Sequence, residues 1–268
     1  MAVYTCYDMI QDCRAGKPKG WSYFIGGYVP IIQALLRHYY PVRSSDSGLL
    51  KRVLLTLRNP DSSLFAALSP LPEREFVAEL RQVVMAIVEQ DGASPQAAIP
   101  LDLETLSSAL ARFSTTEKQA VWLETMRYDP EPAARMLHMH AGTVEKVREQ
   151  AAEALRGRSD AWRRSMIADN GPVLRLLAMQ ARTEQCYPAR TFFDWLDGRI
   201  TWQQREDIDR HLAGCWYCVD LFCRLREVQA LVHNREPLSP EQAEPFRRLL
   251  GIRREETLSF WRRIMGRR

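Results

Sequence analysis

The apolar residues of this chain recur three and four positions apart in almost every segment. That period places them on one face of an α-helix, whereas a strand would need strict alternation of apolar and polar residues. Clear examples are VPIIQALLRHYY, REFVAELRQVVMAIVEQ and TVEKVREQAAEALR, and no run of alternating β-branched residues occurs. The sequence therefore predicts an all-α fold.

Proline- and glycine-rich breaks divide these helical segments into modules. The stretch DGASPQAAIP, residues 91–100, has no periodic apolar residues and is the best candidate for a linker. Further breaks fall at 168–172 and 234–245. We therefore expect helical modules over residues 1–90, 101–166 and 172–233, followed by a basic helical tail over 234–268.

Local signals mark the ends of several predicted helices. Ser114 is followed three residues later by Glu117, the spacing of a capping box at a helix start. Asp129 and Pro130 are typical of the residues that open the next helix. Gly142 lies between two helical stretches, so we expect it to form a tight turn.

Residues 129–156 have the organisation of a helix-turn-helix motif: a short helix, a turn with a glycine and a longer helix. The first residues of a recognition helix contact base edges and phosphates in the major groove. An ordinary αα-hairpin within a helical bundle fits the same pattern. If the motif binds DNA, the candidate contacts are Thr143, Glu145, Lys146, Arg148 and Glu149.

The segment His211-Leu-Ala-Gly-Cys215-Trp-Tyr-Cys218 carries an imidazole and two thiols at positions i, i+4 and i+7. A continuous helix would place all three on one face, and Cys186 could supply a fourth ligand. Such a set is typical of structural zinc. A disulfide pair or buried small side chains are the alternatives. The chain begins without a secretory leader, so we expect a cytoplasmic protein, where spaced Cys and His favour a metal.

Three cysteines, Cys6, Cys13 and Cys223, fall outside this ligand set. Cys223 follows Cys218 by five residues, which allows either a resolving thiol in a redox switch or a buried apolar residue. Burial is the favoured interpretation, because free cysteine is among the most buried residue types.

Composition and motifs exclude several classes of function. The net charge of +4 is too small to indicate a nucleic-acid partner by itself, although the C-terminal stretch is strongly basic. No apolar run approaches the length of a membrane span. No glycine-rich phosphate loop, nucleophile elbow or paired-carboxylate arrangement stands out, so we do not expect an enzyme.

The stretch LETLSSALARFSTTEKQAVWLETMRYDPEPAARMLHMHAGTVEKVREQAAEALR resembles region 4 of the extracytoplasmic-function sigma factors, which are of the sigma-70 type. Ala133-Ala134 and Gly142-Thr143-Val144 occupy the family's Ala-Ala and GTV positions. WSYFIGGYVPIIQALLRHYYP resembles the start of region 2. Residues 186–218 resemble a zinc-binding anti-sigma domain, with its Leu-Asp-Gly turn at 196–198.

The resemblance implies a sigma region 2-like helical domain, a linker, a region 4-like helix-turn-helix domain and a small zinc-binding domain. It implies a transcription initiation factor that binds promoter DNA and the RNA polymerase core. The zinc would be held by Cys186, His211, Cys215 and Cys218. Because the zinc domain is in the same chain, we expect it to contact the sigma-like domains and restrain them; a protein ending near Ser165 should then either transcribe or bind DNA more strongly than the full chain.

A second function remains open for the same chain. In the family, the region 2 helix that binds polymerase is acidic, whereas SSDSGLLKRVLLTLR contains one acidic residue, Asp46. The chain could therefore be a sigma-derived adaptor that binds DNA or protein and no longer recruits polymerase.

Overall fold

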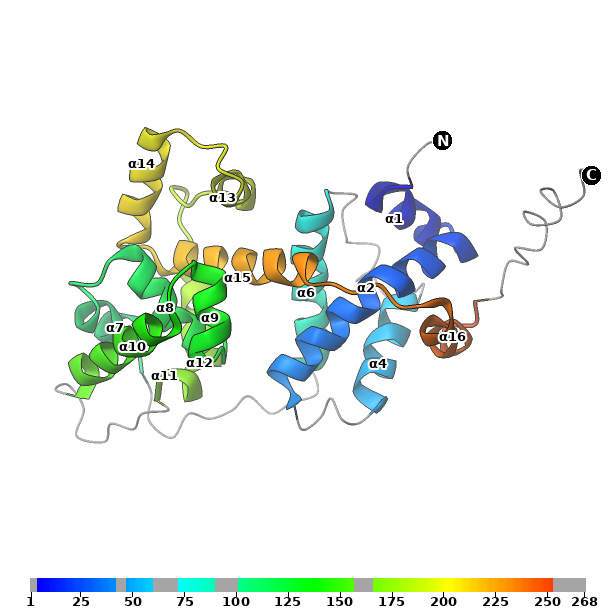
Figure 1. The fold of residues 1–268 in the computed structure, drawn as a ribbon, viewed down its shortest axis with the longest axis horizontal. Coiled ribbons are helices and arrows are strands. Elements are labelled where there is room, and N and C mark those ends of the chain that lie inside the picture. The colour runs from blue at the N-terminus through cyan, green and yellow to red at the C-terminus, as the bar shows by residue number, and fades with distance from the viewer. Residues whose placement is uncertain (1–3, 42–46, 60–71, 90–100, 157–165, 253–268) are drawn as a thin grey trace, which may run out of the picture. The chain divides into compact units, whose positions relative to one another are not determined.

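The computed structural model of the protein describes residues 4–41, 47–59, 72–89, 101–156 and 166–252 (Figure 1). Every regular element within these ranges is a helix, which confirms the predicted all-α class. The chain forms two compact units. The first contains Met1–Gly92 together with Leu231–Arg268, and the second contains Ala93–Ala230.

The first unit is built around a long apolar helix. Its helices are α1 (Cys6–Arg14), α2 (Pro18–Tyr39), α4 (Ser47–Arg58), α6 (Glu73–Glu89) and α16 (Pro240–Leu249). Helix α2 buries residues along most of its length, including Phe24, Tyr28 and Ile32. Trp21 and Tyr39, two aromatics of this helix, are also part of the core.

Gly20 allows α1 and α2 to cross closely. A Cβ atom added at Gly20 would lie 2.6 Å from the backbone nitrogen of Cys13, too close for any side chain. At the same crossing the indole of Trp21 donates a hydrogen bond to the carbonyl of Cys13, at 3.1 Å. The helical hairpin at the N-terminus therefore depends on a residue without a side chain.

The C-terminal segment of the first unit replaces a backbone hydrogen bond that is missing from α2. Pro30 has no N–H, so the carbonyl of Gly26 lacks its usual partner within the helix. The amide of Leu238 donates to that carbonyl instead, at 2.9 Å. Nearby, Arg235 forms an ion pair with Glu73 at 2.6 Å. The segment after α15 is thus an integral part of the first unit.

The second unit contains the helix-turn-helix segment and the metal-ligand segment together. Its helices are α7 (Leu103–Ala109), α8 (Thr115–Thr125), α9 (Pro130–Leu137), α10 (Ala141–Arg156), α11 (Met166–Asp169), α12 (Gly171–Gln180), α13 (Ala189–Leu196), α14 (Trp202–Leu212) and α15 (Trp216–His233, within this unit up to Ala230). Helix α10 packs against α7, α8 and α9, and α8 also packs against α9. The capping box of Ser114 and Glu117 is present at the start of α8, and Asp129 with Pro130 opens α9, both as predicted.

The turn between α9 and α10 differs from the prediction. Gly142 lies inside α10, not in the turn. His138 instead takes the left-handed conformation, with φ of 54°, and ends α9. The next helix begins at Ala141, so the turn needs no glycine.

The break predicted at 168–172 is short, and its central residues, Asn170 and Gly171, are buried. Only Asn170 separates α11 from α12, and it is 1% exposed. Its side chain accepts a hydrogen bond from the amide of Leu101 and donates to the carbonyl of Met166. A Cβ atom on Gly171 would lie 2.2 Å from the carbonyl oxygen of Thr125 in α8. This connection is therefore packed into the unit.

Other predicted segments extend beyond the part of the chain that is described. The predicted linker 91–100 lies outside the described residues, as do 253–268 of the basic tail. Within the described part of that tail, α16 begins at Pro240, inside the predicted break at 234–245.

Candidate metal centre

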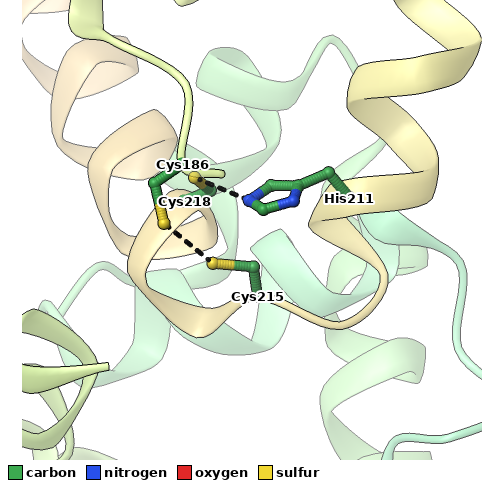
Figure 2. A group of neighbouring side chains, drawn as sticks. All are labelled: Cys186, His211, Cys215 and Cys218. Atoms are coloured by element: carbon green, nitrogen blue, oxygen red, sulfur yellow. Dashed lines mark hydrogen bonds between the residues drawn. The ribbon is translucent and has the colours of Figure 1, made fainter. Parts of the chain in front are cut away.

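The four predicted metal ligands converge at one place in the second unit (Figure 2). The potential ligand atoms of Cys186, His211, Cys215 and Cys218 all lie within 4.8 Å of one another. The sulfurs of Cys186 and Cys215 are 3.6 Å apart, and Nε2 of His211 is 3.2 Å from the sulfur of Cys218. This cluster could bind a metal ion.

The ligands are not on one helical face, which corrects the expectation from their spacing. Helix α14 ends at Leu212 and α15 begins at Trp216, so His211 and Cys218 belong to different helices. Cys215 lies in the junction between them, where its amide donates to the carbonyl of His211 at 3.0 Å. The bend at the junction, rather than the helical period, brings the three side chains together.

Cys186 comes from a loop between α12 and α13. Its amide donates to the carbonyl of Thr183 at 3.2 Å, which closes a tight turn. In return, the amide of Thr183 donates to the sulfur of Cys186 at 3.3 Å, and the Thr183 hydroxyl lies 3.5 Å from the same sulfur. The next residue, Tyr187, packs its ring edge-to-face on His211, with centroids 5.3 Å apart.

The pKa values of Cys215 and Cys218 are shifted in opposite directions. A hydrogen bond from the Cys218 thiol, followed by one from the Cys218 amide, lowers the pKa of Cys215 to about 5. The hydrogen bond to Cys215, together with burial, raises the pKa of Cys218. Cys215 is therefore the more acidic of the two thiols.

The remaining three cysteines are not members of this cluster. Cys223 is fully buried, with 0% exposure, and its sulfur lies 3.9 Å from the carbonyl of Gln119. The interpretation of Cys223 as a buried residue is thus confirmed. Cys13 is buried in the first unit and Cys6 is partly exposed there.

A row of buried polar contacts, which we call the polar seam, joins the metal-ligand segment to α8. The indole of Trp122 donates to Asp220 at 3.0 Å, and the Tyr128 hydroxyl hydrogen-bonds to Glu227. Both acids are on α15 and are at most 1% exposed. Trp122 also stacks on Trp216, with ring centroids 5.1 Å apart.

Two cations extend the polar seam. Lys118, on α8, is buried and donates to the carbonyl of Ala213 at the C-terminal end of α14. Burial lowers the pKa of Lys118. From α15, Arg226 donates to the Gln119 side chain at 3.0 Å and to the carbonyl of Met136 at 2.9 Å. The sequence analysis missed the seam, although Asp220 and Glu227 among the apolar residues of α15 were a signal of it.

Four of the five candidate DNA contacts are exposed on α10. The side chains of Thr143, Glu145, Lys146 and Glu149 are open to solvent, while Val144 and Val147 are buried against the neighbouring helices. The helix therefore has a buried apolar face and an exposed polar face.

Arg148 differs from the other candidates. Its guanidinium donates to the carbonyls of Ala120 and Tyr128, at 3.1 and 2.8 Å, and lies 3.7 Å from a carboxylate oxygen of Glu124. The side chain is 11% exposed, and burial lowers its pKa. Arg148 therefore connects α10 to α8 and to the residues that follow α8. It is not exposed for DNA contact, as its choice as a candidate had assumed.

None of the helices in the described part of the chain is both long and apolar enough to cross a bilayer. Comparisons with known protein families, curated proteins and solved structures give no match to the chain.

Proposed function

We propose that the chain is a sigma-like transcription factor that binds promoter DNA through α9 and α10 and RNA polymerase through its N-terminal unit. The observation that carries the DNA-binding part is the first half of α10. Thr143, Glu145 and Lys146 are exposed there, while Val144 and Val147 anchor the helix. A recognition helix needs this arrangement to enter the major groove.

The metal in the cluster is zinc with a structural role in this proposal. Three thiolates and one imidazole complete a tetrahedral shell, so no position remains open for a substrate or a water. The ion would join the loop around Cys186 to the junction between α14 and α15. Through α15 it would also stabilise the polar seam and, with it, the helix-turn-helix.

A second function, an adaptor that binds another protein, is favoured by the charge of α10. Glu145, Glu149 and Glu153 are exposed along this helix, and Lys146 and Arg156 are its exposed cations. Carboxylates repel DNA phosphates, and Arg148 faces inward. An acidic helix face suits a basic protein surface better than it suits DNA.

Binding experiments with the full chain distinguish the two functions. The sigma-like function predicts that the protein copurifies with core polymerase and retains fragments from a promoter library. Lys146→Ala should then weaken DNA binding and reduce the salt slope by about one unit, because one phosphate contact is lost. Arg210→Ala, an exposed cation on α14, is the control with the same charge change. If the protein retains neither polymerase nor DNA, the sigma-like function is contradicted and the protein-binding adaptor is favoured.

Restraint of DNA binding by the metal-ligand segment is a further part of the proposal. A truncation near Ser165 tests this poorly, because it removes Asp220 and Glu227, the buried partners of Trp122 and Tyr128. Tyr128→Phe deletes one seam hydrogen bond in the intact chain. If the seam holds a closed state, this variant should bind DNA more tightly than the wild type. Equal affinities would contradict the restraint, because a segment that stabilises the closed and open states equally cannot change the balance between them.

A further inference from the structure

We infer that Thr183 is a positioning residue of the metal centre, which holds the sulfur of Cys186 in place and tunes its bond to the metal. The inference rests on metal binding by the cluster and is independent of the role in transcription. It concerns a side chain that is not itself a ligand.

The four ligands are not equally fixed by the fold. His211, Cys215 and Cys218 lie within eight residues of one another at a helix junction, where backbone hydrogen bonds define their positions. Cys186 comes from a loop without helical hydrogen bonds on either side. Its position in the cluster is therefore set by side-chain and turn contacts, among them the packing of Tyr187 on His211 and the hydrogen bonds of Thr183.

Thr183 supplies the contacts that reach the Cys186 sulfur from within the loop. Its carbonyl accepts from the Cys186 amide at 3.2 Å, and its own amide donates to the Cys186 sulfur at 3.3 Å. The hydroxyl lies 3.5 Å from the same sulfur. A metal-bound cysteine is a thiolate and can only accept, so the hydroxyl must donate to it. Two donors from one residue thus converge on one ligand atom.

These donors have an electronic consequence for the metal centre. A hydrogen bond to a thiolate withdraws electron density from the sulfur and lowers the energy of its donor orbitals. Partners of this kind orient ligands and change metal affinity, and their loss typically costs 10- to 100-fold. Cys186 is therefore the ligand whose bond to the metal depends on a neighbouring side chain.

Cobalt(II) titration of the full chain tests the role of the hydroxyl. Thr183→Val keeps the backbone contacts and the side-chain shape but removes the hydroxyl. We expect about 10-fold weaker cobalt binding and a shift of the sulfur-to-cobalt charge-transfer band to longer wavelength. Thr183→Ser keeps the hydroxyl and should match the wild type in both. Thr191→Val, on α13 and outside the cluster, is the matched control.

The possible outcomes separate this inference from metal binding itself. A wild-type protein that binds no cobalt would overturn both. If the wild type binds and Thr183→Val has the same affinity and spectrum, only the role of Thr183 fails. Loss of binding in Thr183→Ser as well would also overturn it, because the hydroxyl would then not be the cause. A folded Thr183→Val that binds no cobalt, with Thr183→Ser unchanged, would support it.

Discussion

The interior of each of the two units is stabilised by a different kind of interaction. In the described part of the first unit, the core is formed by apolar and aromatic side chains, and Arg81 is the buried charged residue, bonded to the hydroxyl of Tyr39 at 2.8 Å. The second unit buries several polar side chains between its segments: Lys118, Gln119, Thr125, Asn170, Asp220 and Glu227.

This difference bears on how each unit responds to change. Apolar burial is roughly proportional to area and is not directional, so the first unit should tolerate changes of similar shape and volume. A buried hydrogen bond needs both partners in place, and loss of one leaves the other unsatisfied. The second unit should therefore be more sensitive to single polar substitutions, and to changes in the candidate metal cluster beside the start of α15.

The largest effect is expected from removal of a metal ligand. Cys215→Ser and Cys218→Ser should each lose most of the bound metal, because each removes one of four ligands, and the free energy of metal binding at a structural site adds to the free energy of folding. Metal analysis and thermal unfolding would show the loss together with a lower unfolding temperature of the second unit. Cys13→Ser in the first unit is the control and should keep its metal. Unchanged zinc in both ligand variants would contradict the site.

A substitution at the centre of the polar seam should have the next largest effect. Asp220 accepts from Trp122 and forms an ion pair with Arg224 at 2.7 Å, with its side chain 2% exposed. Asp220→Ala leaves both donors buried without this partner and should cost about 3 kcal/mol in the free energy of unfolding.

Asp207→Ala is the matched control for the seam variant. Asp207 pairs with Arg210 on the surface of α14, and its side chain is 48% exposed. Chemical denaturation should show a change below about 1 kcal/mol for this exposed pair. Equal destabilisation by the two alanine variants would mean that the polar seam does not hold the second unit together.

The backbone bond between Leu238 and Gly26 offers a smaller test in the first unit. Leu238→Pro removes the N–H that donates to the Gly26 carbonyl, and this should cost about 1 kcal/mol. Amide hydrogen exchange in α16 should accelerate about five-fold, the ratio that corresponds to this energy. Leu238→Ala keeps the N–H and separates the loss of the side chain from that of the bond. No difference between the two variants would exclude a role for the backbone bond.

The smallest effect concerns the reactivity of the cysteines, measured on protein that is free of metal but still folded by circular dichroism. In metal-free protein, the lowered pKa of Cys215, about 5, keeps its thiolate populated at neutral pH. Burial raises the pKa of both Cys13 and Cys223. Alkylation at pH 7 should therefore modify Cys215 first, and its rate should fall as the pH is lowered toward 5. Mapping of the modified peptides measures this; equal reaction at Cys223 would contradict it.

The four residues of the candidate metal cluster could be identified from the sequence, but their arrangement could not. Imidazole and thiol groups at short spacing indicate a metal site wherever the chain brings them together. The spacing also suggested one helical face, and this was wrong because α14 ends at Leu212. Thr183 gave no signal, since a threonine in a loop is ordinary until its hydroxyl is found beside a ligand sulfur.

By itself the sequence determined the helical class, several helix starts and the four residues of the candidate metal cluster, because these depend on apolar period, capping residues and side-chain chemistry over short distances. The tertiary structure decided which segments share a unit. It placed Arg148 on carbonyls of residues 120 and 128, and it joined Leu238 to a helix more than two hundred positions earlier. Contacts of this kind pair groups that are distant in the chain, so no local pattern records them, and only the packed fold brings donor and acceptor together.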